Sequence, residues 1–229
     1  MLKSLIYRCA PNRLVNTLRH YKHLHDLATV SEPDFVHIRH LIHLGDRVLD
    51  VGANFGVFTK FFSEAVGPTG QVFSFEPIPT TFRTLSKAVE RYKLTNVRAM
   101  NVAVSDRNRV ATMQIPRLSE GGDNLYEAEI TATPNAGWRT FEVKTITLDS
   151  LNLPRVDFIK IDVEGHEVEV LNGACNLLMR HRPALLIEVN HREVRSMLSS
   201  LGYQEPMSIT RPNKLFIAPS HLKLVASPK

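Results

Sequence analysis

The stretch RVLDVGANFGVFTKFF, residues 47–62, joins a short apolar run to a helical pattern through a turn that holds two glycines. Residues 48–51 have the length and composition of a buried strand. Apolar residues then recur at the spacing of one helix face, which predicts a helix over about 56–66. A strand that passes into a helix through so short a turn is typical of a parallel α/β sheet.

The same alternation continues along the chain on both sides of this turn. Further buried strands are predicted, in chain order, at 71–77, 97–106, 156–162 and 183–189. Helices are predicted from Ser31 to Gly45, around 82–92, around 168–178, and over 191–201. The segments 203–209 and 214–220 resemble a closing hairpin. The pattern therefore predicts one α/β domain, with helices on both faces of a mostly parallel sheet.

The strand–helix rhythm breaks between Asp106 and Thr147. Segments 110–115 and 139–147 look like strands, and the residues between them include many turn formers but show no period. We expect a small antiparallel insertion whose loop lies over the functional face, where such insertions commonly sit.

Composition limits the class of protein. Of the 229 residues, 43% are hydrophobic and 22% are charged, which is the profile of a soluble globular protein. No apolar run approaches the roughly 18 residues that would span a bilayer. Cys9 and Cys175 are the only cysteines, too few for a disulfide framework and without metal-ligand spacing. A cytoplasmic location is therefore expected.

The N-terminal segment, 1–45, is expected to be helical and to pack on a domain formed by 46–229. Five basic residues precede Asp26, the first acidic residue, and apolar residues recur at helical intervals from Leu14 to Tyr21. A packed amphipathic helix is favoured, because such helices mostly serve cores. A basic surface that contacts a membrane or an anionic substrate, and a targeting peptide, are the alternatives.

The glycine turn lies where an open parallel sheet binds ligands, beyond the carboxyl ends of its strands. Its spacing is G-x-x-x-G, so the dinucleotide fingerprint G-x-G-x-x-G is missing and an oxidoreductase is disfavoured. Gly52 leaves room for a ligand close to the backbone, and Gly56 lets the next helix pack closely. Asp50, just before the turn, would repel a pyrophosphate but attract a cationic ligand.

S-adenosylmethionine suits these residues, because it carries an ammonium and a sulfonium but no phosphate. Glu76, at the end of the second strand, is placed to accept hydrogen bonds from two ribose hydroxyls. Ile78 would stack on the adenine ring. Ser105 and Asp106, at the end of the third strand, would lie near the same ring, with Asp106 accepting an adenine amino hydrogen. Acidic residues in consecutive strand–helix units thus predict a site for this cofactor.

The motifs VLDVGANFGVFT, FSFEP, NVAVSD, TLDSL and FIKIDVEGHEVEVLNGA resemble, in this order, the FkbM family of S-adenosylmethionine-dependent methyltransferases. The resemblance covers about residues 45–190. It implies a seven-stranded, Rossmann-like class I methyltransferase sheet with an antiparallel closing strand. It also implies O-methylation, often of sugar or polyketide hydroxyls, and cofactor contacts at Asp50, Gly52, Asn54 and Glu76. The sequence GGDNL, 121–125, departs from the family pattern of a glycine followed by serines.

Methyl transfer from a sulfonium is a one-step displacement, in which a protein aligns donor and acceptor and helps to remove one proton. The motif KIDVEGHEVEV, 160–170, ends the strand beside the expected methyl group. Asp162 is the best-placed carboxylate for this work, and Glu164 and His166 follow it closely. Imidazole has the intrinsic pKa of a base at neutral pH. A helix cap is the alternative role of Asp162.

A metal site is a weaker alternative at the same sheet edge. Glu188 and Asn190, at the end of the next strand, would with Asp162 offer three oxygen ligands to one Mg²⁺. The family resemblance requires no metal, so none is expected.

The favoured function is methylation of a hydroxyl on a sugar, a polyketide or another small molecule. The formal charge of +5 and the pI near 9.3 suggest a nucleic-acid methyltransferase instead. Against it, the chain has no Asn/Asp-Pro-Pro-aromatic motif to grip an exocyclic amine, and its basic residues do not interleave with aromatic ones. A cofactor-binding partner subunit without chemistry is the other alternative, and the intact acidic set at 162–166 argues against it.

Overall fold

The strand and helix predicted on either side of the glycine turn are present as β1, Arg47–Val51, and α4, Val57–Val66. They belong to a computed structural model that describes residues 26–27, 29–118, 123–188, 192–204, 206–210 and 212–218. β1 is parallel to both of its neighbours, β2, Gln71–Phe75, and β8, Phe158–Ile161. The sheet grows from β1 first on one side and later on the other, so strand order reverses beside it.

The central sheet has seven strands, as the sequence predicts. Its order is β10-β11-β9-β8-β1-β2-β3. β11 is antiparallel to both neighbours, and the remaining pairs are parallel. The bounds of the outer strands are Val97–Met100 for β3, Ala184–Glu188 for β9, Met207–Ser208 for β10 and Asn213–Phe216 for β11.

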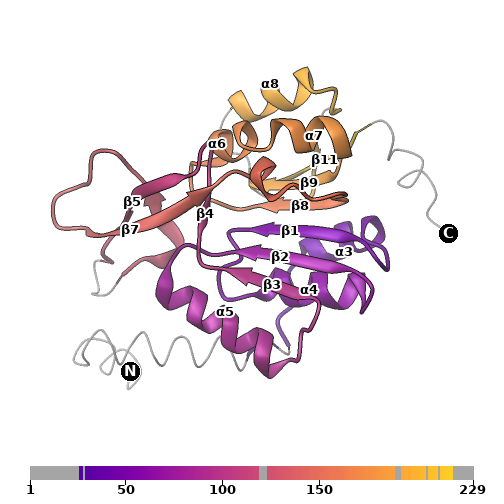
Figure 1. Ribbon diagram of the computed structural model, residues 1–229, viewed down its shortest axis with the longest axis horizontal. Coiled ribbons are helices and arrows are strands. Elements are labelled where there is room, and N and C mark those ends of the chain that lie inside the picture. The colour runs from indigo at the N-terminus through magenta and orange to yellow at the C-terminus, as the bar shows by residue number, and fades with distance from the viewer. Residues whose placement is uncertain are drawn as a thin grey trace.

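Helices cover both faces of this sheet (Figure 1). One face is covered by α4 with α3, Asp34–Ile38, and the short 3₁₀ helix η1, Arg39–Leu41. The other face is covered by α6, Glu167–Asn172, α7, Cys175–His181, and α8, Arg192–Ser200. α5, Pro79–Arg91, joins β2 to β3. No helix of the described residues is long and apolar enough to cross a bilayer.

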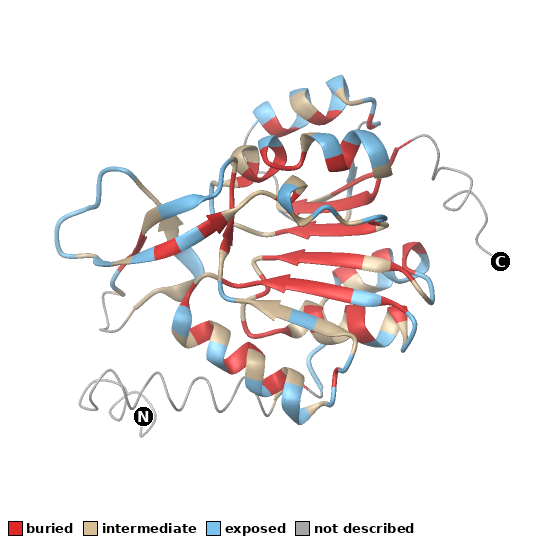
Figure 2. Cartoon of the chain, viewed as in Figure 1, coloured by how far each residue is buried: buried red, intermediate tan, exposed pale blue. Residues whose placement is uncertain are grey.

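Each central strand supplies side chains to two cores. Val48 and Phe158 pack with Phe62 of α4 on one face, whereas Leu49 and Ile159 pack against the helices on the other. Successive side chains of a strand point to opposite faces, so a strand covered on both sides reads as one apolar run. Figure 2 shows the result: the inner strands of the central sheet, β1, β8 and β9, are mostly buried between half-exposed helices.

Only part of the N-terminal segment can be compared with the prediction, because residues 1–25 and 28 lie outside the described part. The packed helix expected around 14–21 falls in that range. Within the described residues, Ile38, Leu41 and Ile42 are buried against the α4 face of the sheet.

The single strand predicted at 97–106 is wrong. The chain leaves the central sheet after Met100 and forms a separate strand, β4, Ala103–Val104. The side-chain amide of Asn101 donates hydrogen bonds to the backbone carbonyls of Glu76 (2.8 Å) and Pro77 (3.0 Å), which holds the bend. β4 then pairs with a strand of a second sheet. The residues that follow β4 are therefore displaced from the third strand of the central sheet.

The single helix predicted around 168–178 is also interrupted. α6 ends at Asn172 and α7 begins at Cys175. A Cβ at Gly173 would lie 2.0 Å from the carbonyl oxygen of Ser105, so the backbone of the break packs directly against the end of β4. The apolar period runs across this break, because both helices bury the same face in the same core.

The predicted antiparallel insertion forms the second sheet, in the order β4-β7-β5-β6. β5, Arg109–Ile115, pairs antiparallel with β7, Arg139–Ile146, and with the two-residue β6, Glu129–Ile130. A 3₁₀ helix, η2, Leu125–Glu127, precedes β6, and η3, Asp149–Leu151, follows β7. Figure 1 shows this sheet standing at the end of the central sheet toward which the parallel strands point.

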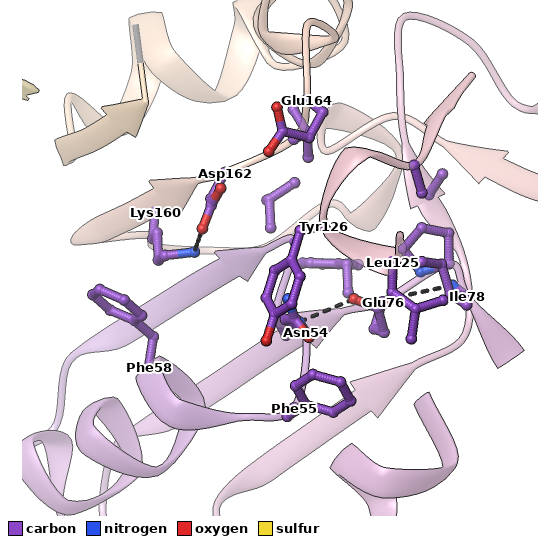
Figure 3. Close-up of a pocket in the computed structure, with 18 of the residues that line it drawn as sticks. Asn54, Phe55, Phe58, Glu76, Ile78, Leu125, Tyr126, Lys160, Asp162 and Glu164 are labelled. Carbon is purple, nitrogen blue, oxygen red and sulfur yellow. Dashed lines mark hydrogen bonds and ion pairs between the residues drawn. The ribbon is translucent and has the colours of Figure 1, made fainter. Parts of the chain in front are cut away.

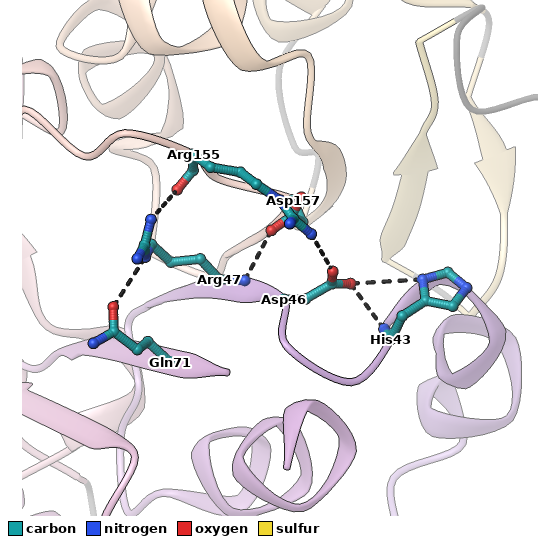
Figure 4. Close-up of polar contacts among 6 residues, drawn as sticks. All are labelled: His43, Asp46, Arg47, Gln71, Arg155 and Asp157. Atoms are coloured by element: carbon teal, nitrogen blue, oxygen red, sulfur yellow. Dashed lines mark hydrogen bonds and ion pairs between the residues drawn. The ribbon is translucent and has the colours of Figure 1, made fainter. Parts of the chain in front are cut away.

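The opposite, amino end of β1 is closed by a polar network (Figure 4). The buried Asp46 carboxylate accepts hydrogen bonds from Arg155 Nη2 (2.7 Å) and from the backbone N–H of His43 (2.8 Å). Asp157 accepts from the backbone N–H of Arg47 at 2.8 Å. The network links the starts of β1 and β8 at the edge of the sheet remote from the glycine turn.

Candidate active site

A cavity of about 540 Å³ opens at the carboxyl ends of β1, β2 and β8. Its volume lies within the roughly 300–1,000 Å³ typical of small-molecule sites. The loops after the three strands form one side, and residues of the second sheet and η2 form another (Figure 3). Of the residues predicted from the sequence, it brings together Gly52, Asn54, Glu76, Ile78, Asp162, Glu164 and His166.

The glycine turn is shaped by close packing as well as by access for a ligand. Gly52 has φ +78°, and a Cβ there would lie 1.8 Å from the carbonyl oxygen of Asp162. Gly56 has φ +96° at the start of α4, and a Cβ there would lie 2.8 Å from Leu85 in α5. The crossing of the β8 loop over Gly52 is a constraint that the sequence did not reveal.

Glu76 is anchored in the cavity wall by the backbone on either side. Its Oε2 accepts a hydrogen bond from the N–H of Asn54, and its Oε1 accepts one from the N–H of Ile78, both at 2.9 Å. The residue is only 4% exposed. Burial raises the pKa of Glu76 to about 7, although the two N–H donors act to lower it. Each oxygen keeps a further lone pair for a ligand.

Asp50 does not line the cavity, contrary to the expectation that it faces a cationic ligand. Its carboxylate is fully buried, and Oδ2 accepts a short hydrogen bond of 2.6 Å from the hydroxyl of Thr59. Oδ1 has no hydrogen-bond partner and lies 3.9 Å from Lys160 Nζ. Burial raises the pKa of Asp50, while Lys160 and Thr59 oppose that rise. Asp50 can therefore act on a cation in the cavity only through long-range electrostatics, and not by direct contact.

Lys160 is a cavity residue that the sequence reasoning missed. It belongs to β8, its side chain is 5% exposed, and its Nζ lies 2.8 Å from Oδ2 of Asp162. The ammonium also lies 4.6 Å from the centre of the Phe58 ring. The sequence did contain a signal for Lys160, because a lysine inside the apolar run FIKI needs a buried anion as a partner.

Asp162 and Glu164 lie in the loop after β8 but in different electrostatic surroundings (Figure 3). Burial acts to raise the pKa of Asp162, but the Lys160 ion pair and a hydrogen bond with Glu188 outweigh it and lower that pKa. Glu164 has no hydrogen-bond or ion-pair partner among the described residues. Burial, Asp162 and Glu127 together raise the pKa of Glu164. Asp162 is therefore the weaker base of the two.

His166 lines the cavity at the start of α6 but is engaged by protein groups on both sides. Its Nε2 lies 2.9 Å from the hydroxyl of Ser105, and its Nδ1 lies 3.5 Å from Oε2 of Glu169. Burial lowers the pKa of His166, more than the two nearby acids, Glu169 and Asp106, raise it. Burial thus favours the neutral imidazole, and both ring nitrogens lie beside protein groups.

Ser105 and Asp106 do not line the cavity, because they follow β4 of the second sheet and not a strand of the central one. Ser105 is fully buried and holds His166. Asp106 accepts hydrogen bonds from its neighbour Arg107, at 3.0 and 2.8 Å. The wall near Ile78 is instead formed by the apolar residues 102–104. The expected contact of Asp106 with an adenine is therefore not supported by its position.

Leu125 and Tyr126 of η2, with residues of β6, complete the cavity. Tyr126 lines it, is 55% exposed, and lies edge-on to Phe55 of the glycine turn with 6.4 Å between ring centres. Sequence reasoning placed this insertion over the site but selected none of its residues. Of the GGDNL stretch, Gly121 and Gly122 lie outside the described part, and Asp123 forms an ion pair of 2.8 Å with Arg139.

The alternative metal site cannot be assembled as expected from the described residues. Asn190 lies outside them, and Asp162 already pairs with Lys160. The described part of the chain contains no group of three or more His, Cys, Asp or Glu side chains placed to hold a metal ion.

The reversal of strand order at β1, the antiparallel β11 and a cavity built on the ends of β1, β2 and β8 define the class I methyltransferase fold. A family model described as "Methyltransferase FkbM domain" matches residues 50–205. The chain belongs to this family, as its motifs indicated. S-adenosylmethionine, the expected cofactor, is the methyl donor that the family uses.

Individual proteins are similar over part of their length. Hexuronic acid methyltransferase AglP of Haloferax volcanii is 31% identical over 137 residues, which cover 58% of this chain and 52% of AglP. Methyltransferase 1 of Beauveria bassiana is 24% identical over 143 residues, or 55% of this chain and 57% of that protein. The chain thus spans about half the length of these curated relatives.

A solved structure shows the same fold. The crystal structure of methyltransferase FkbM from Methylobacillus flagellatus KT superposes with a TM-score of 0.53 and 17% sequence identity. The superposition covers 81% of this chain and 50% of the other.

Proposed function

We propose that the protein is an S-adenosylmethionine-dependent O-methyltransferase that acts on a hydroxyl of a sugar, a polyketide or another small molecule. The observation that carries this proposal is the pairing, in one cavity, of the backbone-anchored Glu76 carboxylate with the acid–base residues 162–166. The first is suited to a ribose and the second to a proton transfer. Neither Glu76 nor residues 162–166 would be suited to bind a phosphate group.

The residues present fit the cofactor. Glu76 has lone pairs left for two hydroxyls, and Ile78 offers an apolar surface beside it. Asn54 has φ +50° and a buried side-chain oxygen without a hydrogen-bond partner, and it lines the same cavity. A buried acceptor left unpaired is unfavourable unless a ligand donates to it. The ammonium of the cofactor would be such a donor.

When bound, S-adenosylmethionine supplies an electrophilic methyl group. The protein residues must then orient the acceptor hydroxyl and take up its proton. Glu164 is the best base of the three candidates, because its pKa is raised and no described residue occupies its carboxylate. Asp162, held by Lys160, is suited to orient the hydroxyl through its remaining oxygen. His166, with Ser105 beside one ring nitrogen and Glu169 beside the other, would shape the cavity wall.

Two features support a small-molecule acceptor over a nucleic acid. Acidic side chains outnumber basic ones among the described residues that line the cavity, which is unfavourable for phosphates. Those basic residues are Lys160, already paired with Asp162, and His166. The printed name of the relative AglP refers to a sugar acid, which supports a carbohydrate acceptor. The predicted cytoplasmic location stays part of this proposal.

Radiolabelled methyl transfer from S-adenosylmethionine would test the function. The acceptor panel should contain neutral glycosides, uronic acids, hydroxylated polyketides, catechols and RNA, each with and without a chelator. We expect alkali-stable label on a hydroxyl-bearing small molecule, unaffected by the chelator. Alkali-labile label on uronic acids would show a methyl ester, and label on RNA would show the nucleic-acid alternative. Cofactor binding without transfer to any acceptor would favour the partner-subunit alternative.

A further inference from the structure

Lys160 is a buried cation for which the family resemblance implies no role. It lies in the middle of the sheet, with β1 on one side and β9 on the other. Removing an ammonium from water costs several kcal/mol unless anions and donors compensate it. A lysine retained there must therefore interact strongly with its surroundings.

Among the described residues, the charged groups that act most strongly on Lys160 are acids from three adjacent strands. Asp162 lies at 2.8 Å at the end of β8, and Asp50 lies at 3.9 Å on β1. Glu188, at the end of β9, also acts on the ammonium. Phe58 of α4 places its ring 4.6 Å away, which adds a cation–π contact and excludes water on that side.

The two closest acids differ in what they can do without Lys160. Asp50 is fully buried and has an oxygen with no hydrogen-bond partner, so the nearby cation is its main compensation. The Asp162 side chain is 41% exposed and faces the cavity, so solvent could replace part of the ion pair. Lys160 thus bridges a buried structural acid and an acid of the site.

We propose that Lys160 is a positioning residue that fixes the carboxylate of Asp162 at the cavity wall and keeps it ionised beside the buried Asp50. The predicted effect on turnover rests on the proposed methyltransferase function, whereas the effect on the Asp162 carboxylate does not. The ammonium donates to Oδ2 at 2.8 Å, and this contact ties the carboxylate of a cavity-lining residue to a rigid strand. Figure 3 shows the pair across the cavity from Ile78.

Three variants separate positioning from simple charge compensation. Lys160→Met removes the cation and keeps the length of the side chain, and Lys160→Arg keeps the cation. The double variant Lys160→Met/Asp50→Asn removes the cation together with the buried acid that most needs it. Lys87→Met, on the exposed face of α5, is the matched control.

The first measurement does not depend on activity. Carboxyl-carbon NMR of Asp-labelled protein, assigned with Asp162→Asn, follows the titration of the Asp162 carboxyl. We expect Lys160→Met to move its midpoint up by about 1 to 3 pH units, the effect of losing an opposite charge at this distance. Lys160→Arg and Lys87→Met should leave it within about half a unit of the wild type. An unchanged midpoint in Lys160→Met would overturn the proposal even if no acceptor were ever found.

The second measurement uses turnover with the acceptor found in the methyl-transfer panel. Lys160→Met should lower kcat by about a hundredfold, the cost of a misplaced catalytic group, with a change of only a few-fold in the KM for the cofactor. Lys160→Arg should recover much of kcat. The double variant should regain stability but not kcat. Recovery of kcat in the double variant would show that Lys160 only compensates Asp50, and the positioning role would be wrong.

Discussion

The raised pKa of Glu76 makes a prediction that can be tested on the ligand-free protein. An unfolded glutamate titrates near 4.5, whereas the buried Glu76 titrates at about 7. Between these values the folded protein keeps a proton that the unfolded chain has lost. Folding therefore takes up a proton in this interval, and the free energy of unfolding must fall as pH rises through it.

The size of the effect follows from the shift. A difference of about 2.5 pH units, from 4.5 to about 7, corresponds to about 3 kcal/mol of differential stability. The contribution is fully present below pH 4.5, is lost as pH rises to about 7, and does not change further above that. No reduction for solvent screening is needed, since Glu76 is only 4% exposed.

Urea unfolding of wild type and Glu76→Gln, each measured across this pH interval, isolates the contribution of Glu76. Glutamine does not titrate, so the difference between the two proteins removes the contribution of every other group that titrates equally in both. We expect wild type to lose about 3 kcal/mol relative to the variant between pH 4.5 and pH 8. The exposed Glu90→Gln in α5 is the matched control and should show no such change.

A difference between wild type and Glu76→Gln that stays constant with pH, within about 1 kcal/mol, would refute the reasoning. It would mean that water or a local rearrangement solvates Glu76 and that the buried geometry is not the one in solution. Calorimetry with S-adenosylhomocysteine extends the test to the ligand. Affinity should rise with pH up to about 7 in wild type, and Glu76→Gln should weaken it by about 1–3 kcal/mol.

Three other substitutions probe separate parts of the structure. Asp162→Asn should keep cofactor affinity within a few-fold while turnover falls by about 10²-fold or more, and near-normal kcat would leave Asp162 only a structural role. Gly52→Ala should lower the melting temperature well beyond Gly137→Ala, because both glycines have positive φ but only at Gly52 would a Cβ lie 1.8 Å from a backbone oxygen. Equal decreases in melting temperature for the two variants would show that this steric clash does not affect stability. Asp46→Ala should cost about 2 kcal/mol in urea unfolding yet leave kcat unchanged, and a large loss of kcat would connect the two ends of β1.

The sequence was informative where the local structure requires a particular type of residue, such as an apolar residue or a glycine. The buried strands read as apolar runs because each is covered on both faces, and Gly56 marks the start of α4 because its φ of +96° excludes most side chains. Glu76 could be selected in advance, since a carboxylate that ends a buried strand meets the ligand edge of a parallel sheet. Family membership followed from the order of such motifs.

The errors have a common cause in contacts between distant segments. The strand at 97–106 bends because Asn101 binds the carbonyls of Glu76 and Pro77, more than twenty residues away. That bend carries Asp106 away from the cavity and brings Ser105 to His166. Hydrophobic periodicity indicates which residues of one segment are buried. It cannot predict a hydrogen bond from that segment to a residue distant in the sequence.

The sequence by itself therefore determined the fold class, the family and the sheet edge at which a ligand binds. Only the tertiary structure decided which acids at that edge face the cavity and what state each one is in. Asp50 lies near the end of β1 and Asp162 directly follows β8, yet Asp50 is buried beneath the wall and Asp162 faces the cavity. The physical reason is that ionisation depends on desolvation and on the nearest charge, and Lys160 reaches both acids only once β1 and β8 are paired.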